Sequence, residues 1–282
     1  MKNNIGIVGN GFVGGAVANG IKPFADIRIY DALKERSTHH YNDVIFSDFI
    51  FVCLPTPMVD VEGGKCNLSI VEKFFEELPS VCDGIFIIKS TVPIGTTKKL
   101  CEKYPHLKII HNPEFLTAAN ANDDFINADR TVLGGEKEWV KPVKKMYKKI
   151  FPNIPIYTMK STESECVKYF ANCFLASKLM FFNEMKVFTE SIKNVNYDTI
   201  IEGVISDNRI GNSHYDVPGP DGEYGFGGTC FPKDINSLIH TMEEHEVDPM
   251  ILRSVWKQNK NYRLNWDWAD FSSAVLKEKE EV

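Results

Sequence analysis

The sequence predicts an α/β protein in which a doubly wound sheet is followed by an all-helical region. Three observations predict it: apolar runs alternate with polar helical stretches in the first half, a glycine-rich turn follows the first run, and the pattern becomes helical after about residue 155. Strands and helices that alternate at this spacing are typical of βαβ units. We expect one domain over residues 1–158 and a helical domain over 159–282.

Six short apolar runs are expected to form the sheet. Several of them are β-branched without polar alternation, which suits parallel strands buried on both faces. The predicted strands are Ile5–Val8, Ile27–Tyr30, Ile50–Leu54, Ile85–Ile88, Lys108–Ile110 and Thr131–Leu133.

A long helix is predicted from about Thr162 to Lys193, because this stretch lacks Pro and Gly and repeats apolar residues at helical spacing. Thr162 and Glu165 resemble a capping box. A helix of this length, ~45 Å at 1.5 Å per residue, can join two domains or line a subunit interface. Further helices are predicted over Tyr197–Val204, Ile235–Glu244 and Pro249–Asn261, with a functional loop over 212–229 and a frayed helix end at the tail KEKEEV.

Composition excludes several classes of protein. The 282 residues carry a net charge of −6, which gives no electrostatic footprint for nucleic acid. No apolar run approaches the ~18 residues of a membrane span, and the N-terminus lacks the pattern of a secretory signal. The seven cysteines are irregularly spaced, so neither a disulfide framework nor a metal site is expected. The sequence therefore predicts a cytoplasmic protein.

The glycine-rich turn GNGFVG predicts a dinucleotide site of the Rossmann-like type, where the glycines allow a tight turn and close approach of a pyrophosphate. Asp31 stands 22 residues after Gly9, at the end of the second predicted strand, where its carboxylate can accept the ribose hydroxyls. That carboxylate also repels the extra phosphate of NADP, so NAD is the expected cofactor. The alternative is a glycine-rich turn without a ligand. The residues expected to bind the cofactor here are Gly9, Gly11, Phe12, Val13, Gly14 and Asp31.

Cys230 is the candidate nucleophile, since it closes the glycine-rich stretch GFGGTC and is followed closely by Lys233 and Asp234. Glycines let a substrate approach the backbone and the sulfur together, and nearby charges can tune a thiol. A cysteine is more often a small buried apolar residue. The residues alone leave both interpretations open.

Other polar residues are candidates for the same chemistry. Lys168 and Asn172 are four residues apart and so share a helix face, where they could stabilise an oxyanion or simply be solvated. Thr91 and Glu114 follow predicted strands, where α/β folds bind ligands, although Ser, Asn and Pro beside them also suit plain turns.

Seven motifs occur together, and with them the chain resembles the UDP-glucose/GDP-mannose dehydrogenase family. They run through nearly the whole chain in family order: GNGFVG, FVCLPTP, STVPIGTT, NPEFL, ECVKYFANCFLASK, DNRIG and GFGGTCFPKD. The resemblance implies that a nucleotide sugar is oxidised at an alcohol carbon to a carboxylate with two NAD molecules in succession, through a cysteine thiohemiacetal and a thioester.

The resemblance also implies roles for particular residues. By position, Cys230 matches the nucleophile and Asp234 the acidic residue that assists it. Lys168 matches the lysine that stabilises the oxyanion, and Asn172 the asparagine that helps it.

Thr91 matches the threonine that holds an ordered water, and Glu114 the glutamate assigned to general-base work in hydrolysis. Arg209 matches an arginine that reaches the sugar of a neighbouring subunit, which implies a homodimer through the long helix near 162–193. The resemblance places Pro55, Thr56 and Thr91 at the cofactor, and Phe115, Leu116, Lys168, Asn172, Arg209, Phe226 and Gly227 at the substrate.

The chain departs from the family pattern in three places. Ala118 stands where a further glutamate is usual, the segment after Asp31 is short, and the chain ends at Val282 without the usual second Rossmann-like domain. We expect UDP-glucose as substrate, with UDP-N-acetylmannosamine and GDP-mannose open. The alternatives are an impaired NAD-binding dimerisation module, one half of a two-chain dehydrogenase, or a β-hydroxyacid dehydrogenase that needs no cysteine nucleophile.

Overall fold

The computed structural model describes residues 4–117 and 120–276. The chain folds into two compact units. Unit 1 contains Met1–Thr56 and Leu68–Lys168, and unit 2 contains Pro57–Asn67 and Tyr169–Val282. The division between the units falls between Lys168 and Tyr169, within the long helix, and the short segment Pro57–Asn67 of the first half belongs to unit 2. Ala118 and the tail 277–282, on which two predictions rest, lie outside the described residues.

Unit 1 is built on a seven-stranded sheet with the order β2-β1-β3-β4-β5-β6-β7. The first five strands are parallel, and β6 pairs with β5 in the antiparallel direction through His111 and Gly134. All six predicted strands are present. The strands are β1 Asn4–Val8, β2 Asp26–Tyr30, β3 Phe49–Val52, β4 Ile85–Ile88, β5 Lys108–His111, β6 Thr131–Gly134 and β7 Ile156–Met159.

Two predictions about the sheet need correction. The direction of β6 was not foreseen, because a buried apolar run looks alike in either direction. The edge strand β7 was also missed, since its sequence IYTM is only half buried and carries no continuous apolar run.

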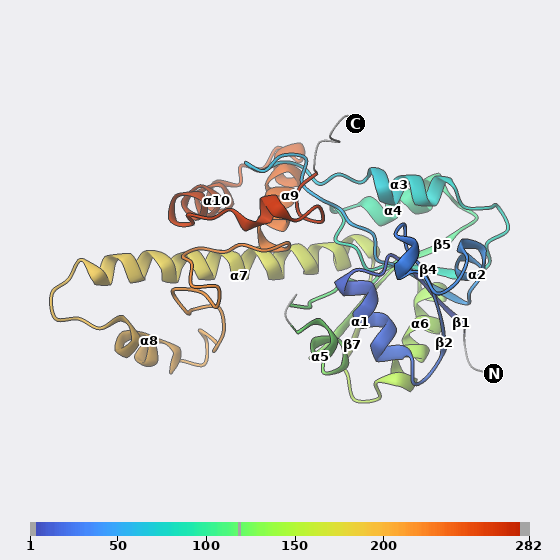
Figure 1. Ribbon diagram of the computed structural model, residues 1–282, viewed down its shortest axis with the longest axis horizontal. Coiled ribbons are helices and arrows are strands. Elements are labelled where there is room, and N and C mark those ends of the chain that lie inside the picture. Colours follow the sequence, from blue (N-terminus) through green and yellow to red (C-terminus); the bar gives the residue numbers. More distant parts are fainter. Residues whose placement is uncertain (1–3, 118–119, 277–282) are drawn as a thin grey trace. The chain divides into compact units, whose positions relative to one another are not determined.

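Helices cover both faces of the sheet in unit 1 (Figure 1). On one face α1, α5 and α6 enclose a core that includes Val17, Phe125 and Val143. On the other face α2, α3 and α4 enclose a second core that includes Val44 and Phe75. The helices are α1 Phe12–Ile21, α2 Tyr41–Ile45, α3 Ser69–Glu76, α4 Thr96–Lys103, α5 Ala121–Ile126 and α6 Lys137–Ile150, with a 3-10 turn η1 at Lys34–Arg36. This confirms the doubly wound α/β prediction.

The sheet order places a topological switch point between β1 and β3. From β1 the chain moves to β2 on one side and then returns to β3 on the other. Open α/β sheets bind ligands in the crevice at the carboxyl ends of strands where the winding reverses. The turns after β1 and β3 are therefore brought together at this edge.

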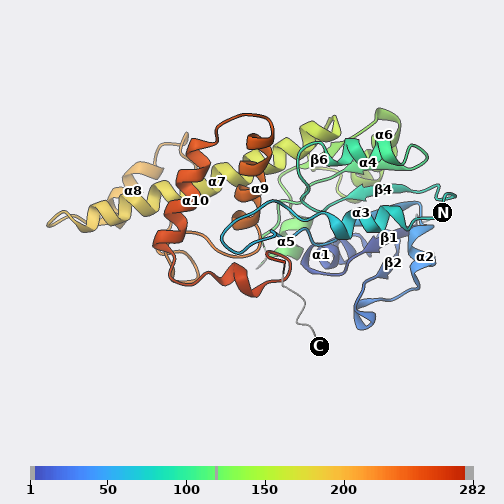
Figure 2. The ribbon, with the colours of Figure 1, turned by 90° about the horizontal axis from the view of Figure 1, so that it is seen from above.

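Unit 2 is helical and is organised along α7, Ser161–Glu190, whose first residues belong to unit 1. Helix α9 packs on α7, where the Tyr169 hydroxyl lies 2.8 Å from Ser237 Oγ. Helix α8 packs on α7 through Phe182 and Tyr197, and α9 lies beside α10 (Figure 2). The remaining elements are α8 Tyr197–Ile205, α9 Phe231–Glu244, α10 Met250–Tyr262 and the 3-10 turn η2 Asp267–Asp270.

The predicted capping box at the start of α7 is wrong. Glu165 lies inside the helix and accepts backbone N–H groups of Gly95 and Thr97, at 2.5 and 2.8 Å, where α4 begins. Glu163 instead accepts the N–H of Lys160, at 2.7 Å. A sequence pattern cannot distinguish a carboxylate that caps its own helix from one that caps another.

Helix α9 begins earlier than predicted, at Phe231 rather than Ile235. Pro232 lies in its first turn, where the missing N–H of proline costs no helical hydrogen bond. Lys233 and Asp234 are consequently helical residues. Helix α7 ends at Glu190, close to the predicted Lys193.

Within the described ranges, no helix combines the length and the apolarity that a membrane span requires. Likewise, no cluster of three or more His, Cys, Asp and Glu side chains among those residues is arranged to hold a metal ion.

Replacing Phe75 by Ala should lower the free energy of unfolding by about 3–5 kcal/mol, because its ring is 1% exposed and the truncation leaves a cavity. The same substitution at Phe46, which is 49% exposed, is the matched control and should cost far less. Urea unfolding of both variants measures the difference. Equal losses would contradict the placement of Phe75 in the second core.

Candidate active site

The glycine turn after β1 has the geometry that close approach of a ligand requires. Gly9 has φ +91°, and a Cβ there would lie 2.5 Å from the carbonyl oxygen of Cys53. A Cβ on Gly14 would lie 1.9 Å from the carbonyl oxygen of Gly9, so this glycine lets α1 approach the turn. At Gly11, which caps α1, a Cβ would meet no heavy atom within 4 Å. The open side of the turn therefore faces outward at the helix N-terminus, which is favourable for a phosphate.

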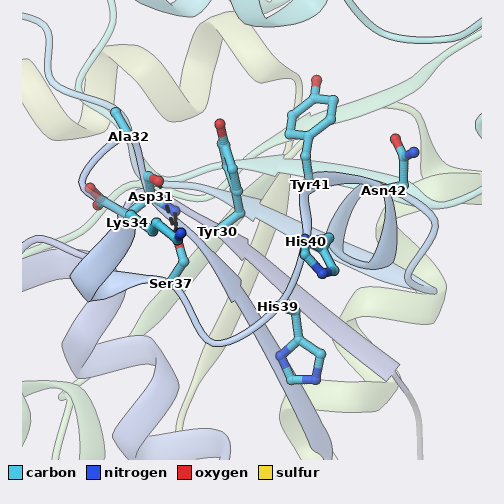
Figure 3. Close-up of a pocket in the computed structure, with 9 residues that line it drawn as sticks. All are labelled: Tyr30, Asp31, Ala32, Lys34, Ser37, His39, His40, Tyr41 and Asn42. Atoms are coloured by element: carbon cyan, nitrogen blue, oxygen red, sulfur yellow. Dashed lines mark hydrogen bonds between the residues drawn. The ribbon is translucent and has the colours of Figure 1, made fainter.

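Asp31 is held beside this turn by two backbone donors. Its Oδ2 accepts the N–H of Asn10 at 2.6 Å, and its Oδ1 accepts the N–H of Leu33 at 2.8 Å. A pocket of about 570 Å³ adjoins the carboxylate (Figure 3). Its lining residues are Tyr30, Asp31, Ala32, Lys34, Ser37, His39, His40, Tyr41 and Asn42.

Tyr41 gives this pocket an aromatic wall. Its ring meets that of Tyr30 edge to face, with centroids 5.1 Å apart. Burial raises the pKa of Tyr41 to about 12, and its hydroxyl has no hydrogen-bond partner among the described residues. A pocket with a carboxylate on one side and aromatic rings on another suits the ribose and base of a nucleotide.

The segments after β3 and β4 are joined at the same edge. The Thr56 hydroxyl donates to the carbonyl of Thr91 at 2.7 Å, and the Ser90 hydroxyl donates to the carbonyl of Leu54 at 2.7 Å. Because Pro55 lies between Leu54 and Thr56 in the chain, these two hydrogen bonds hold the turn that contains it. The structure brings Thr56 and Thr91 together, beside the strand end that carries Gly9.

Glu114, after β5, and Lys168, on α7, form a buried ion pair. Their carboxylate Oε1 and ammonium Nζ are 2.7 Å apart, and the two residues are 5% and 2% exposed. The second oxygen of Glu114 accepts the N–H of Leu116 at 2.7 Å. The Phe115 ring contacts two cations. Its centroid is 5.7 Å from Lys168 Nζ and 4.5 Å from the Arg130 guanidinium. Two of the three predicted catalytic residues of unit 1, Glu114 and Lys168, thus contact each other.

Lys89 lies beneath the turn that carries Glu114 and was not singled out from the sequence. Its Nζ donates to Asn112 Oδ1 and to the carbonyl of Pro113, both at 3.3 Å. Desolvation lowers the pKa of Lys89 to about 8, although the Cys53 thiol and the Glu114 carboxylate oppose the shift. Burial also raises the pKa of Cys53 to about 12.

His111, the last residue of β5, is a buried neutral group next to this cluster. Desolvation, helped by the charges of Lys89 and Lys168, lowers its pKa to about 3. Its Nδ1 lies 2.9 Å from the Ser164 hydroxyl, and its Nε2 has no hydrogen-bond partner among the described residues.

In unit 2, Cys230 is the N-cap residue of α9 and is partly exposed. Lys233, one turn along, forms an ion pair with Asp234. Desolvation alone would lower the pKa of Lys233, but Asp234, Cys230 and Cys66 raise it above its usual value. A cation and a helix N-terminus therefore lie near the Cys230 sulfur, and both favour a thiolate.

Asp234 connects α9 to α7. It is 1% exposed, and its Oδ2 accepts Asn172 Nδ2 at 2.6 Å. The predicted Asn172 is thus paired with the predicted Asp234, and it is not a solvated surface amide.

The glycine loop before Cys230 is held by residues that no sequence motif had singled out. Asn259 of α10 bonds both backbone groups of Phe226, at 2.7 and 3.0 Å. A Cβ on Gly227 would lie 2.1 Å from Asp267 Oδ1 and 2.3 Å from Arg263 Nη2. Phe226 is 3% exposed and lies in the core of unit 2, with both of its backbone groups bonded to Asn259.

Arg209 lies apart from these residues on the surface of unit 2. Its guanidinium group is 90% exposed and pairs with Asp207.

The fold and the glycine turn define a dinucleotide-binding α/β protein with an appended helical unit. Residues 28–154 match the NAD binding domain of the UDP-glucose/GDP-mannose dehydrogenase family, and residues 162–261 match the central domain of the same family. The chain belongs to this family, as its motifs had indicated, and NAD is the cofactor that the first domain implies.

Individual relatives agree with this assignment. The chain is 34% identical to a UDP-glucose 6-dehydrogenase of Rickettsia conorii over 85% of its own length and 57% of the relative's. It is 33% identical to one of Pseudomonas aeruginosa over 76% and 48%. A UDP-glucose dehydrogenase structure from Pyrobaculum islandicum superposes with a TM-score of 0.81 at 26% identity, over 93% of this chain and 68% of that one. The chain spans about half the length of the curated relatives that it matches.

The buried His111 should make stability fall in acid. Its pKa in the folded state is about 3, below the ordinary 6.5, so the unfolded chain binds the extra proton between these values. The stabilising contribution is present above pH 6.5 and is lost as the pH falls, at about 1.4 kcal/mol per pH unit.

Urea unfolding at pH 7, 6 and 5 measures this slope. His111→Gln should flatten it, whereas His106→Gln, at an exposed position, should leave it unchanged. A wild-type slope that survives His111→Gln would assign the effect to another group.

Proposed function

We propose that this chain supplies the catalytic centre for NAD-dependent oxidation of a nucleotide sugar, with UDP-glucose converted to UDP-glucuronate as the expected reaction. The observation that carries the proposal is the arrangement around Cys230: a helix N-terminus, the Lys233 ammonium, and an Asp234 carboxylate held by Asn172. A structural cysteine needs none of these. The names of the three relatives described above, two UDP-glucose 6-dehydrogenases and one UDP-glucose dehydrogenase, support the substrate.

Unit 1 has the features that hold NAD. The open face of Gly11 can receive the pyrophosphate, and Phe12 and Val13 begin the helix that follows it. Asp31 and its pocket suit the adenosine ribose. The segments of Pro55, Thr56 and Thr91 form the neighbouring wall. When bound, NAD accepts a hydride in each of two oxidations.

The segment between Asp31 and β3 is short, and we predict that its length affects cofactor affinity. The family usually has an insertion there, and we expect weaker cofactor affinity without it.

Cys230 allows the second oxidation. The first removes two electrons from the alcohol and leaves an aldehyde. The Cys230 sulfur then bonds to the aldehyde carbon to give a thiohemiacetal, which becomes a thioester when its carbon loses a hydride and its hydroxyl loses a proton. Water finally attacks the thioester carbon, the C–S bond breaks, and the thiol is regenerated with the carboxylate. The sum is one alcohol, one water and two NAD to one carboxylate, two NADH and three protons.

The remaining residues assist these steps. We assign Lys168, with Asn172, to stabilise negative charge on the reacting oxygen, and Asp234 to assist the cysteine. Glu114 takes a proton from the attacking water that Thr91 helps to hold. The Lys168–Glu114 ion pair supports this division, because it places the proposed oxyanion stabiliser directly beside the proposed base. Phe115, Leu116, Phe226 and Gly227 are assigned to the sugar.

Cys230→Ser should abolish uronate formation while NAD binding is retained. Serine is much less nucleophilic than a thiolate, and Cys230 lies in unit 2, outside the NAD-binding unit. The assay counts NADH formed per UDP-glucose consumed, where the wild type should give two. Cys101→Ser, on α4, is the control and should keep both products.

Unchanged turnover in Cys230→Ser would remove the nucleophile from the proposal. NAD binding by a wild-type chain that yields no NADH with any nucleotide sugar would favour the alternative of an impaired module or one half of a two-chain enzyme.

We further propose a homodimer through α7. Four phenylalanines on this helix, spaced by four, seven and seven residues, lie within about 40° on one face at 100° per residue. They are exposed by 53–66%, although aromatic side chains of this size are normally covered. A second copy of the same helix, bound about a twofold axis, covers such a stripe with itself. The four residues are Phe170, Phe174, Phe181 and Phe188.

Phe174→Glu should convert the dimer to a monomer, since it places a charge in the middle of the apolar stripe. Light scattering coupled to size exclusion gives the molar mass directly. Phe24→Glu, at a 42% exposed position in unit 1, should leave the mass unchanged. A wild-type monomer at micromolar concentration would refute the dimer.

A further inference from the structure

Lys89 is a buried cation to which the family motifs assign no task. It follows β4, is 4% exposed, and carries an ammonium whose burial costs several kcal/mol of solvation. Its hydrogen bonds go to the two residues that precede Glu114, namely Asn112 and Pro113. A cation retained at such a cost next to a catalytic candidate is a functional candidate itself.

The turn that bears Glu114 is held from several sides. Asn112 Oδ1 also accepts the Tyr147 hydroxyl at 2.6 Å, and Asn112 Nδ2 donates to the carbonyl of Val132 at 2.7 Å. These bonds fix the Asn112 side chain. The carbonyl of Pro113, however, is held by Lys89 in the described structure, and Pro113 is the residue directly before Glu114. Lys89 is thus the link between the fixed asparagine and the carboxylate.

We propose that Lys89 is a positioning residue for thioester hydrolysis: its ammonium holds the Asn112–Pro113 turn and so aims the Glu114 carboxylate at the attacking water. The inference rests on the proposed function and adds a residue to it. Only the last step depends on Lys89, in which the water oxygen bonds to the thioester carbon, its proton passes to Glu114, and the Cys230 sulfur leaves. The two hydride transfers need no base at Glu114.

The strength of the hydrogen bonds that Lys89 donates to Asn112 and Pro113 depends on its protonation state. Both bonds are long, and a charged donor makes a stronger hydrogen bond than a neutral one. The groups that face it are the Cys53 thiol after β3, His111 and Glu114 of the β5 segment, Lys168 of α7, and the Phe125 ring of α5, whose centroid is 5.8 Å from Nζ. With a pKa of about 8, Lys89 holds its proton at neutral pH and loses it in mild base. Hydrolysis should therefore slow as the pH rises through about 8.

The test separates the hydride steps from hydrolysis in the full chain with NAD and UDP-glucose. Stopped-flow absorbance gives the burst of NADH, and intact-protein mass spectrometry gives the fraction of Cys230 that carries the sugar thioester. Lys89→Met should retain a burst of two NADH per site but hydrolyse the thioester ~10–100-fold more slowly, so the adduct accumulates. Lys149→Met, at an exposed position on α6, should behave as wild type.

Lys89→Arg tests the charge, since arginine stays protonated throughout this range. It should restore much of the hydrolysis rate and move its decline to higher pH. Where either variant melts early or fails to bind NAD, the pH profile of thioester hydrolysis in the wild type decides: a rate that stays flat from pH 7 to 9.5 overturns the role.

A slowed burst in Lys89→Met without adduct accumulation would also overturn it, since that result places Lys89 before hydrolysis. Absence of both NADH and adduct in the wild type would overturn the proposed function, and the positioning role with it.

Discussion

The buried ion pair between Lys168 and Glu114 is the constraint on which the rest of unit 1 depends. A charge that leaves water loses several kcal/mol of solvation, so each partner must find the other at short range. The 2.7 Å contact therefore fixes the first turns of α7 against the segment after β5. Removing one partner would leave the other as an unpaired buried charge, so the first turns of α7 are coupled to the segment after β5.

The same junction is strengthened by a second buried carboxylate. Glu165, three residues before Lys168 on α7, accepts two backbone N–H groups at the start of α4. Burial raises its pKa, while the hydrogen bonds from Thr97 and Gly95 lower it. The segment with Thr91 leads directly into α4, so the helix that carries Lys168 also holds the loop that carries Thr91. Parallel strands make this possible, because their carboxyl ends meet at one edge.

In unit 2 a buried carboxylate likewise holds neighbouring polar side chains in place. Asp234 is buried at the start of α9 and gathers Lys233 and Asn172, so the residues next to Cys230 are fixed before any ligand arrives. The glycine loop in front of the cysteine is framed by α10 and η2, whose side chains bond its backbone groups. The glycines leave room for a ligand to approach, and polar residues distant in the sequence hold the loop rigid.

The sequence by itself determined six of the seven strands of unit 1, the helices α7, α8, α9 and α10 in outline, the glycine turn with Asp31, and the family. Continuous apolar runs and glycine spacing are local signals, and they need no partner to be recognised. Only the tertiary structure decided that Glu165 caps α4, that β6 is antiparallel, that Lys89 lies under the Glu114 turn, and that Asn259 holds the loop before Cys230. Those facts depend on contacts between residues 20 to 70 positions apart, which no local pattern encodes. A buried polar side chain must form a hydrogen bond, and the fold decides which donor or acceptor lies next to it.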